Sequence, residues 1–406
     1  MTDSLDAFTG RFRAAMMPAV PSPLAVLSHG KGARVWDVDG HEYLDFLGGI
    51  AVNALGHAHP VFTAAVARQA ERIAHISNHF ASEPELALAE RLQRLTGGDT
   101  VYFANSGTEA IEAAVKLARR TGRPRILSLT GSFHGRTMGA LSLTGKPALQ
   151  DPFRPLLPGT EQIPPTIEAL EAALAAGAGD DVAALVVEPI QGEAGVVDLP
   201  AGYLTAAREL TSRAGALLIL DEIQTGIGRT GEWFAYQAEG VVPDAVALAK
   251  GLGGGFPIGA LVGFGEAAQL LQPGQHGSTY GGNPLATAVS GAVLAEIEDA
   301  GLVANAALRG AQLREAITGM ASPLVAGLSG RGLLIGVVLT APLATQVVAA
   351  AQERGLIVNA AAEGRVRLAP PLVIGDAEVA EFAEKFAAAL AAVTHSETTT
   401  PTGATA

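Results

Sequence analysis

Short apolar runs alternate with longer stretches of helical periodicity between about residues 60 and 300. Each run spans only a few residues and is bounded by turn residues, which is typical of strands buried on both faces of a parallel sheet. The runs predicted as strands are Val101–Ala104, Arg125–Leu129, Ala184–Val187, Ala216–Leu220, Asp244–Ala249 and Ala260–Phe264. Their alternation with helices predicts βαβ units, and therefore an α/β fold built on a large, mostly parallel sheet.

The two ends of the chain carry a different pattern. Residues 35–46 form two short runs around Asp39-Gly40, which predicts a β-hairpin, whereas residues 1 to about 22 predict a weakly structured lead-in. Strands near Leu333–Leu339 and Arg365–Leu368 predict a smaller α+β region. The predicted organisation is an N-terminal segment that joins the small domain (1–60), a large domain (61–304), a C-terminal small domain (305–394) and a disordered polar tail (395–406).

Composition limits the partners that this chain can have. Hydrophobic residues make up 49% of the 406, which is ample for a large core. The net charge of −13 argues against nucleic acid or an anionic membrane as a partner, because both attract basic surfaces. The chain has no cysteine, no apolar stretch long enough to span a bilayer and no signal-peptide core at its acidic start. We therefore expect a soluble, cytoplasmic protein.

Two of the apolar runs end in residues of opposite charge. Leu220 is followed by Asp221, and Ala249 is followed by Lys250. Because ligands of open α/β sheets gather at the carboxyl ends of the strands, both side chains are expected to face one site. An amine and a carboxylate match what pyridoxal phosphate needs, namely a lysine for its aldehyde and an anion for its ring nitrogen. A structural ion pair is the alternative that the spacing leaves open.

A turn rich in small residues follows another predicted strand. Val101–Ala104 leads through Ser106-Gly107-Thr108 into a helix that starts near Glu109. The free N–H groups and the dipole at such a helix start form an anion site that suits a phosphate. Ser and Thr are equally common as ordinary helix caps, so the turn by itself leaves both interpretations open.

Further candidates lie in loops after the strands. Phe133 can stack on a planar ring and Arg136 can hold a carboxylate at two points, unless Phe133 is core and Arg136 is a surface charge. Four more residues are ambiguous when taken singly: Glu193, Ser278, Thr279 and Arg367.

Two other patterns are set aside. Gly253-Gly254-Gly255 follows a strand but lacks the G-x-G-x-x-G spacing of a dinucleotide site. The histidines of His57-Ala58-His59 and His75–His79 have no H-E-x-x-H motif and no cysteine support. No metal site is therefore predicted.

Taken in order, these segments resemble the class III pyridoxal-phosphate aminotransferases from about residue 20 to residue 392. Within that class the chain is most similar to the acetylornithine aminotransferases, through Gly49–His57, Ala104–Ala110 and Leu220–Gly226. Ornithine-specific relatives usually carry a tyrosine in the first segment that grips free ornithine. The stretch Leu47–Ile50 has none, which favours an acylated substrate. Ile111 departs from the family, which often has asparagine there.

The resemblance implies a role for each candidate residue. Lys250 would form the Schiff base and move the proton, Asp221 would pair with the pyridine nitrogen, and Gln224 would hydrogen-bond the ring hydroxyl. The remaining implied cofactor contacts are Ser106, Gly107, Thr108 and Phe133, with Thr279 reaching the phosphate from a second subunit. The implied substrate contacts are Arg136 for the far carboxylate, Arg367 for the carboxylate beside the reacting carbon, and Ser278. Because acetylornithine has no carboxylate beside its reacting carbon, Glu193 is predicted to act as a switch that pairs with Arg367 in its place, unless Glu193 is a solvated loop charge.

The resemblance also implies fold type I, as in aspartate aminotransferase, with a cofactor-binding large domain and an active site shared across a homodimer. The implied reaction transfers the terminal amine of N2-acetylornithine to 2-oxoglutarate in arginine biosynthesis, giving N-acetylglutamate 5-semialdehyde and glutamate. Succinylornithine, succinyldiaminopimelate, free ornithine and 4-aminobutyrate are alternative donors for the same chemistry. A non-catalytic binding protein on the same scaffold is a different class, which the retention of Lys250 and Asp221 argues against.

Overall fold

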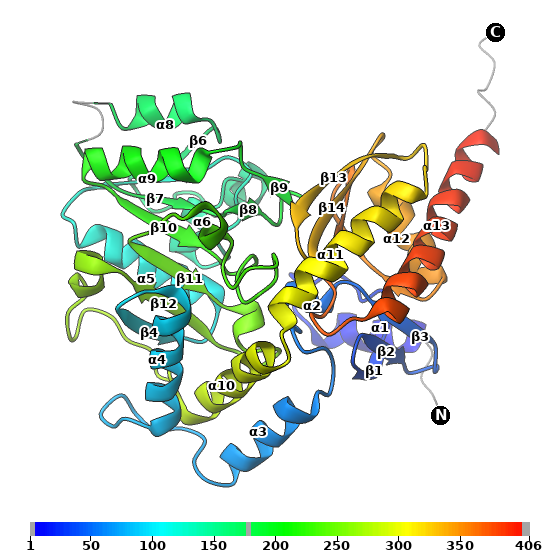
Figure 1. The fold of residues 1–406 in the computed structure, drawn as a ribbon, viewed down its shortest axis with the longest axis horizontal. Coiled ribbons are helices and arrows are strands. Elements are labelled where there is room, and N and C mark those ends of the chain that lie inside the picture. The colour runs from blue at the N-terminus through cyan, green and yellow to red at the C-terminus, as the bar shows by residue number, and fades with distance from the viewer. Residues whose placement is uncertain (1–4, 176–179, 400–406) are drawn as a thin grey trace.

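The computed structural model describes residues 5–175 and 180–399, which form two lobes (Figure 1). The larger lobe is built on a seven-stranded sheet in the order β4-β12-β11-β10-β7-β5-β6. Its strands, in that order, are Thr100–Ala104, Gly259–Gly263, Ala245–Leu248, Leu217–Asp221, Val182–Val187, Arg125–Leu129 and Thr160–Ile163. Only β12 runs antiparallel to its neighbours, so the predicted large, mostly parallel sheet is confirmed.

Helices cover both faces of this sheet. Val186 packs with the cluster that α5 and α6 provide, whereas its neighbours Leu185 and Val187 pack with the cluster that includes α4, α9 and α10. This alternation explains why the strands read as continuous apolar runs. The helices of this part are α3 (Pro60–Ala70), α4 (Glu83–Thr96), α5 (Gly107–Arg119), α6 (Met138–Leu143), α7 (Pro147–Gln150), α8 (Ile167–Ala173), α9 (Tyr203–Ala214) and α10 (Pro284–Asp299).

The smaller lobe joins both ends of the chain. The predicted hairpin is present as β2 and β3, and β3 pairs in parallel with β15, so an early and a late segment share one sheet. A second sheet has the order β13-β14-β17-β16. The strands are β1 (Leu27–Lys31), β2 (Arg34–Asp37), β3 (Glu42–Asp45), β13 (Val325–Arg331), β14 (Leu334–Leu339), β15 (Leu356–Ile357), β16 (Asn359–Ala362) and β17 (Arg365–Leu368). The domain limits at 60, 304 and 394 stay predictions.

Short elements complete the described chain. The helices of the smaller lobe are α11 (Leu302–Gly319), α12 (Ala344–Glu353) and α13 (Asp376–Thr399), with α1 (Leu5–Ala15) and α2 (Gly48–Ala51) before them. The hairpin β8 (Ile190–Gln191) and β9 (Val197–Asp198) lies between the lobes in Figure 1. Single turns of 3-10 helix are η1 (Asp151–Phe153), η2 (Ala235–Glu239), η3 (Lys250–Leu252) and η4 (Gly265–Gln269).

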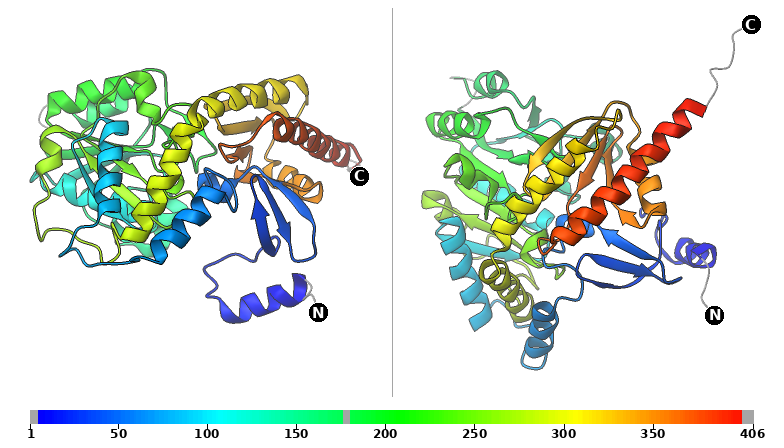
Figure 2. Two further views of the ribbon diagram at one scale, coloured as in Figure 1. Left: turned by 60° about the horizontal axis from the view of Figure 1, so that its bottom comes forward. Right: turned by 45° about the vertical axis from the view of Figure 1, so that its right-hand side comes forward.

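Both chain ends differ from the sequence prediction. The lead-in contains helix α1, which stands apart from the two lobes in the left view of Figure 2. Its apolar Leu5, Phe8 and Phe12 have helical spacing, but the helix is too short and polar to give a clear pattern. Helix α13 continues to Thr399. Residues 395–399 are therefore helical, whereas the sequence predicted a disordered tail, because they continue the Ala-rich helix that precedes them. The rest of that tail lies outside the described residues.

None of the described helices combines the length and the apolar character that a bilayer span requires.

Candidate active site

The carboxyl ends of two neighbouring strands deliver the predicted lysine and aspartate to one cavity. Asp221 is the last residue of β10 and lies opposite Ala247 of β11, three residues before Lys250. Both side chains line a cavity of about 360 Å³. The other predicted residues that line it are Ser106, Gly107, Thr108, Phe133, Arg136 and Gln224. The structure therefore brings together most of the site that the sequence predicted.

Lys250 has a strained backbone and a perturbed amine. Its φ of 45° lies in the left-handed region, which costs a non-glycine residue about 1–3 kcal/mol and is concentrated at functional sites. Burial lowers the pKa of Lys250 to about 8, with the guanidinium of Arg367 acting in the same direction against the opposing charge of Glu193. A substantial fraction of this amine is therefore neutral near physiological pH, as a nucleophilic lysine requires.

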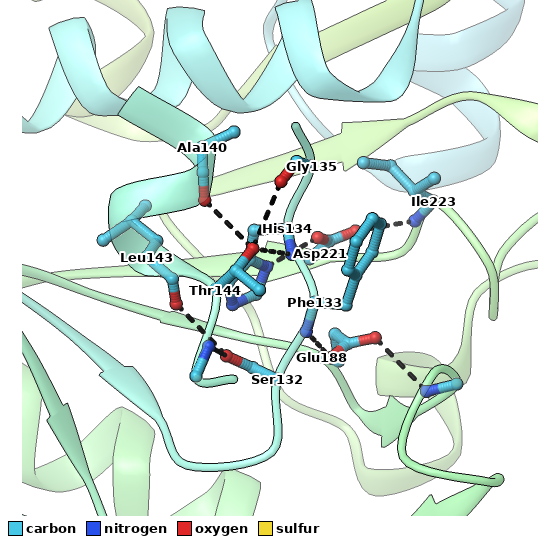
Figure 3. Close-up of polar contacts among 12 residues, drawn as sticks. Ser132, Phe133, His134, Gly135, Ala140, Leu143, Thr144, Glu188, Asp221 and Ile223 are labelled. Atoms are coloured by element: carbon cyan, nitrogen blue, oxygen red, sulfur yellow. Dashed lines mark hydrogen bonds and ion pairs between the residues drawn. The ribbon is translucent and has the colours of Figure 1, made fainter. Parts of the chain in front are cut away.

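Asp221 is held in place by a buried histidine that the sequence did not single out. Nδ1 of His134 donates a 2.7 Å hydrogen bond to Oδ2 of Asp221, and the backbone N–H of Ile223 donates to Oδ1 at 3.1 Å (Figure 3). Burial by itself lowers the pKa of His134, but the hydrogen bond and the charge of Asp221 outweigh burial and raise it. A protonated His134 would offset part of the charge of Asp221 and fix the direction of its carboxylate.

Glu188 connects two loops of the site. Its carboxylate accepts hydrogen bonds from the backbone N–H groups of Phe133 at 2.9 Å and Gly192 at 3.2 Å (Figure 3). Burial raises the pKa of Glu188 to about 7, with the charge of Asp221 adding to it and that of His134 opposing it. Glu188 thus fixes the loop that carries Phe133 against the loop that carries Glu193, a role that no pattern in the sequence indicates.

The turn before α5 is both a helix cap and part of the cavity wall. Oγ of Ser106 accepts a 3.3 Å hydrogen bond from the N–H of Glu109, as an ordinary cap does. Thr108 shares a 2.8 Å hydrogen bond with Thr137, which joins the turn to the loop after Phe133. A Cβ at Gly259 of β12 would overlap the backbone oxygen of Ser106, so glycine permits the close approach that shapes this wall. The helix start that faces the cavity can accept an anion.

A buried arginine lies beside this cavity and forms an ion pair with a glutamate. The side chain of Arg367 is 1% exposed, and its Nη1 donates to the carboxylate of Glu193 and, at 3.2 Å, to Oε1 of Gln224. Nη2 donates to Oδ1 of Asn359 at 2.8 Å, and Nε has no hydrogen-bond partner among the described residues. Burial by itself raises the pKa of Glu193, but the charge and hydrogen bond of Arg367 outweigh it and lower the pKa. Glu193 is therefore paired here and is not a solvated loop charge.

Two predicted residues, Ser278 and Thr279, lie outside the cavity lining, and a third, Arg136, lines the cavity without being buried. Thr279 is exposed and does not line the cavity, and Ser278 instead accepts a 3.0 Å hydrogen bond from Asn105. Arg136 lines the cavity but is exposed, and its guanidinium carbon lies 5.5 Å from the centre of the Phe133 ring. The ligands assigned to these residues stay predictions.

The architecture and the site together define a class of enzyme. An α/β lobe with a lysine and an aspartate at neighbouring strand ends, joined to a smaller lobe built from both chain ends, is the arrangement of pyridoxal-phosphate transferases of fold type I. Residues 15–390 match the family described as Aminotransferase class-III, and the chain therefore belongs to the class III aminotransferases.

Individual relatives agree over nearly the whole length. An acetylornithine aminotransferase from Streptomyces coelicolor is 54% identical over 381 residues, covering 93% of this chain and 94% of that protein. The crystal structure of an ornithine aminotransferase from Toxoplasma gondii matches with a TM-score of 0.92 and 36% identity, covering 97% and 96%. That of N-acetylornithine aminotransferase from Stenotrophomonas maltophilia matches with a TM-score of 0.83 and 37% identity, covering 95% and 99%.

The cofactor of this class is pyridoxal 5'-phosphate, and the cavity fits it. The cofactor needs an amine that is partly neutral, an anion held in a fixed direction and a phosphate site. Lys250, Asp221 with its histidine, and the start of α5 offer these three features around one space.

Proposed function

We propose that this chain transfers the terminal amine of N2-acetylornithine to 2-oxoglutarate in the cytoplasm, as a step of arginine biosynthesis. The products would be N-acetylglutamate 5-semialdehyde and glutamate. The observation that carries the proposal is the pairing of Glu193 with the buried Arg367 beside a cavity that holds Lys250 and Asp221. The names of the acetylornithine aminotransferase relatives and the lack of a tyrosine in Leu47–Ile50 support the same donor.

The cofactor, when bound, supplies an aldehyde and a ring that accepts electrons from the reacting carbon. Lys250 would hold the aldehyde of the cofactor. Once released, it would carry the proton between the reacting carbon of the substrate and the carbon of that aldehyde group. Asp221 would keep the ring nitrogen protonated, with His134 fixing the carboxylate. Ser106, Gly107 and Thr108 would bind the phosphate at the start of α5. Phe133 would cover one face of the ring, and Gln224 would bind its hydroxyl.

The two substrates differ in the carboxylates that they bring to the site. Glutamate reacts at its α-amine, so one carboxylate lies beside the reacting carbon and the other lies far from it. Acetylornithine reacts at its terminal amine, so it has the far carboxylate only. Arg136 would bind the far carboxylate of both substrates, whereas Arg367 would bind the near carboxylate of glutamate. Glu193 would cover Arg367 during the acetylornithine half-reaction, because an unpaired buried charge costs several kcal/mol.

A panel of donors tests this assignment. With 2-oxoglutarate as acceptor, N2-acetylornithine is expected to give the highest kcat/KM, and free ornithine a value at least about tenfold lower, a difference of about 1.4 kcal/mol. The panel includes succinylornithine, succinyldiaminopimelate and 4-aminobutyrate as the other donors. A higher kcat/KM for any of these than for N2-acetylornithine would overturn the assignment of the donor while leaving the chemistry in place.

Glu193→Gln tests the switch over Arg367. We expect the acetylornithine half-reaction to lose about tenfold more rate than the glutamate half-reaction, because only the first leaves Arg367 without a substrate carboxylate. The two half-reactions are measured separately by single turnover. Glu171→Gln, an exposed site on α8, is the matched control and should leave both rates unchanged. Equal losses in both half-reactions would make Glu193 a structural residue.

A homodimer with shared sites completes the proposal. Thr279 is exposed on its own chain, and the surface near it includes apolar side chains that a single chain leaves uncovered, among them Phe80 and Tyr280. A polar, glycine-rich loop that crosses to a second subunit would place Thr279 on the phosphate of that subunit and cover these side chains. Symmetric two-fold dimers are the commonest soluble oligomers, and in them each subunit can reach the site of the other.

A further inference from the structure

Lys146 contacts the residue that acts as the switch. It follows Gly145 in the loop between α6 and α7, and its Nζ donates a 2.5 Å hydrogen bond to the backbone oxygen of Glu193. Among the described residues, Nζ hydrogen-bonds to that oxygen alone. An ammonium group has three donors, so two remain for a further acceptor. The side chain is half-buried, which keeps it close to the site while water still reaches it.

The backbone beneath Lys146 is held firmly. Gly145 donates to the backbone oxygen of Ser132 at 3.0 Å, and its own oxygen accepts from the N–H of Gly131 at 2.8 Å. A Cβ at Gly145 would overlap the backbone oxygen of Leu129, so the loop lies directly against the end of β5. The ammonium group therefore projects from a fixed point towards Glu193 and does not depend on a mobile surface loop.

When the substrate glutamate displaces the carboxylate of Glu193 from Arg367, one of the cations around Glu193 is left to bind that carboxylate. Arg367, Lys250 and Lys146 all lower the pKa of Glu193 against burial, which by itself would raise it. In the glutamate half-reaction the near carboxylate of the substrate takes Arg367, and Lys250 either holds the cofactor or carries the proton. Of the three cations, only Lys146 then has no other assigned partner. A displaced, partly buried carboxylate with no partner would raise the cost of binding glutamate.

The two cations already contact the same residue, because Arg367 binds the carboxylate of Glu193 and Lys146 binds its backbone oxygen. The side chain of Glu193 is 28% exposed in its pair with Arg367, so it lies at the edge of the site and has room to turn. Lys146 is already bonded to the backbone of the same residue. Rotation about the side-chain bonds of Glu193 can therefore exchange one cation for the other, and rotations of this kind are fast compared with turnover.

We propose that Lys146 receives the carboxylate of Glu193 whenever a dicarboxylate substrate occupies Arg367, and so sets the affinity of the enzyme for glutamate and 2-oxoglutarate. Lys146 is a positioning residue in this scheme, because it acts through Glu193 and touches neither substrate. The proposal rests on the proposed function for the role of Glu193. It deepens that role by naming the residue that binds the Glu193 carboxylate once this carboxylate has left Arg367.

The test measures the binding of glutarate, an unreactive dicarboxylate, to the holoenzyme through the absorbance of the cofactor. Lys146→Met and Lys146→Gln are expected to weaken glutarate binding about tenfold, which corresponds to about 1.4 kcal/mol. Lys146→Arg keeps the charge and should restore binding. In single turnover, Lys146→Met should slow the glutamate half-reaction about tenfold more than the acetylornithine half-reaction. Lys31→Met removes the same charge from exposed strand β1 and is the matched control.

Two results would overturn the proposal. If Lys146 only anchors the loop, Lys146→Gln will bind glutarate as well as Lys146→Arg does, or both half-reactions will slow equally. If Lys146 binds the dicarboxylate directly, Lys146→Met will still weaken glutarate binding about tenfold in a Glu193→Gln enzyme. If the proposal is correct, Lys146→Met will weaken glutarate binding less than about twofold in the Glu193→Gln enzyme, because residue 193 then has no carboxylate for Lys146 to bind. Glutarate binding does not depend on the donor, so this test and the donor panel can fail independently.

Discussion

Replacing Lys250 with alanine is expected to lower turnover by about 10⁴-fold or more, because one side chain both holds the cofactor and carries the proton. Borohydride reduction of the wild-type holoenzyme followed by peptide mapping should place the pyridoxyl group on Lys250. Finding that group on Lys116 or Lys146 would contradict the assignment. Lys116→Ala is the matched control, because Lys116 is exposed and bonds to His276 outside the cavity, and it should leave both labelling and turnover intact.

The lowered pKa of Lys250 also predicts how the rate of cofactor capture depends on pH. Only the neutral amine attacks an aldehyde, so the rate at which apoenzyme captures the cofactor should rise with the neutral fraction of Lys250. Because burial lowers the pKa of Lys250 to about 8, this rate should reach half of its maximum near pH 8 and level off about one pH unit higher. An unperturbed lysine, with a pKa of 10.5, would still be gaining rate at pH 9. A stopped-flow profile of capture from pH 6 to pH 10 that still rises steeply above about pH 9 would mean that Lys250 is not the desolvated amine.

The parts of the fold that the sequence predicted are those whose signals are local. Strands β10 and β11 are buried on both faces, so their apolar runs and the charged residues that end them are visible in a short window. The missed strands lack that signal. Strand β6 is an edge strand of mixed polarity, and β13 is half-buried along its length and contains two glycines, so neither forms an apolar run.

The missed parts of the site are contacts between distant segments. His134 and Asp221 are 87 residues apart, and Lys146 and Glu193 are 47 apart, so no local pattern pairs them. His134 follows Phe133 directly in the chain, but only the structure shows that its ring hydrogen-bonds to the aspartate and is fully enclosed. The pairing of Glu193 with Arg367 was expected for a different reason. The chemistry of two unlike substrates requires a partner for a buried arginine, and that requirement does not depend on separation along the chain.

Two inactive variants are expected to regain activity when their subunits are exchanged, if the active site is shared. Lys250→Ala removes the amine from its own chain, and Thr279→Glu would place a carboxylate against the phosphate in the neighbouring site. Thr279 is exposed on its own chain, so the substitution should not disturb folding. Equal mixing makes half of the dimers mixed, and each mixed dimer has one site with neither defect. Activity should therefore reach about a quarter of the wild-type value.

A second mixture separates a shared site from a site within one chain. Wild-type subunits are exchanged with subunits that carry both Lys250→Ala and Thr279→Glu, using different tags to confirm that mixed dimers form. If Thr279 serves the neighbouring site, the mixed dimers contain no intact site, and only the wild-type homodimers, about a quarter of all dimers, remain active. If Thr279 serves its own chain, every wild-type subunit stays active and the mixture keeps about half of the activity. A value near one half, with no recovery in the first mixture, would place the whole site in one chain and would require a different role for the exposed loop around Thr279.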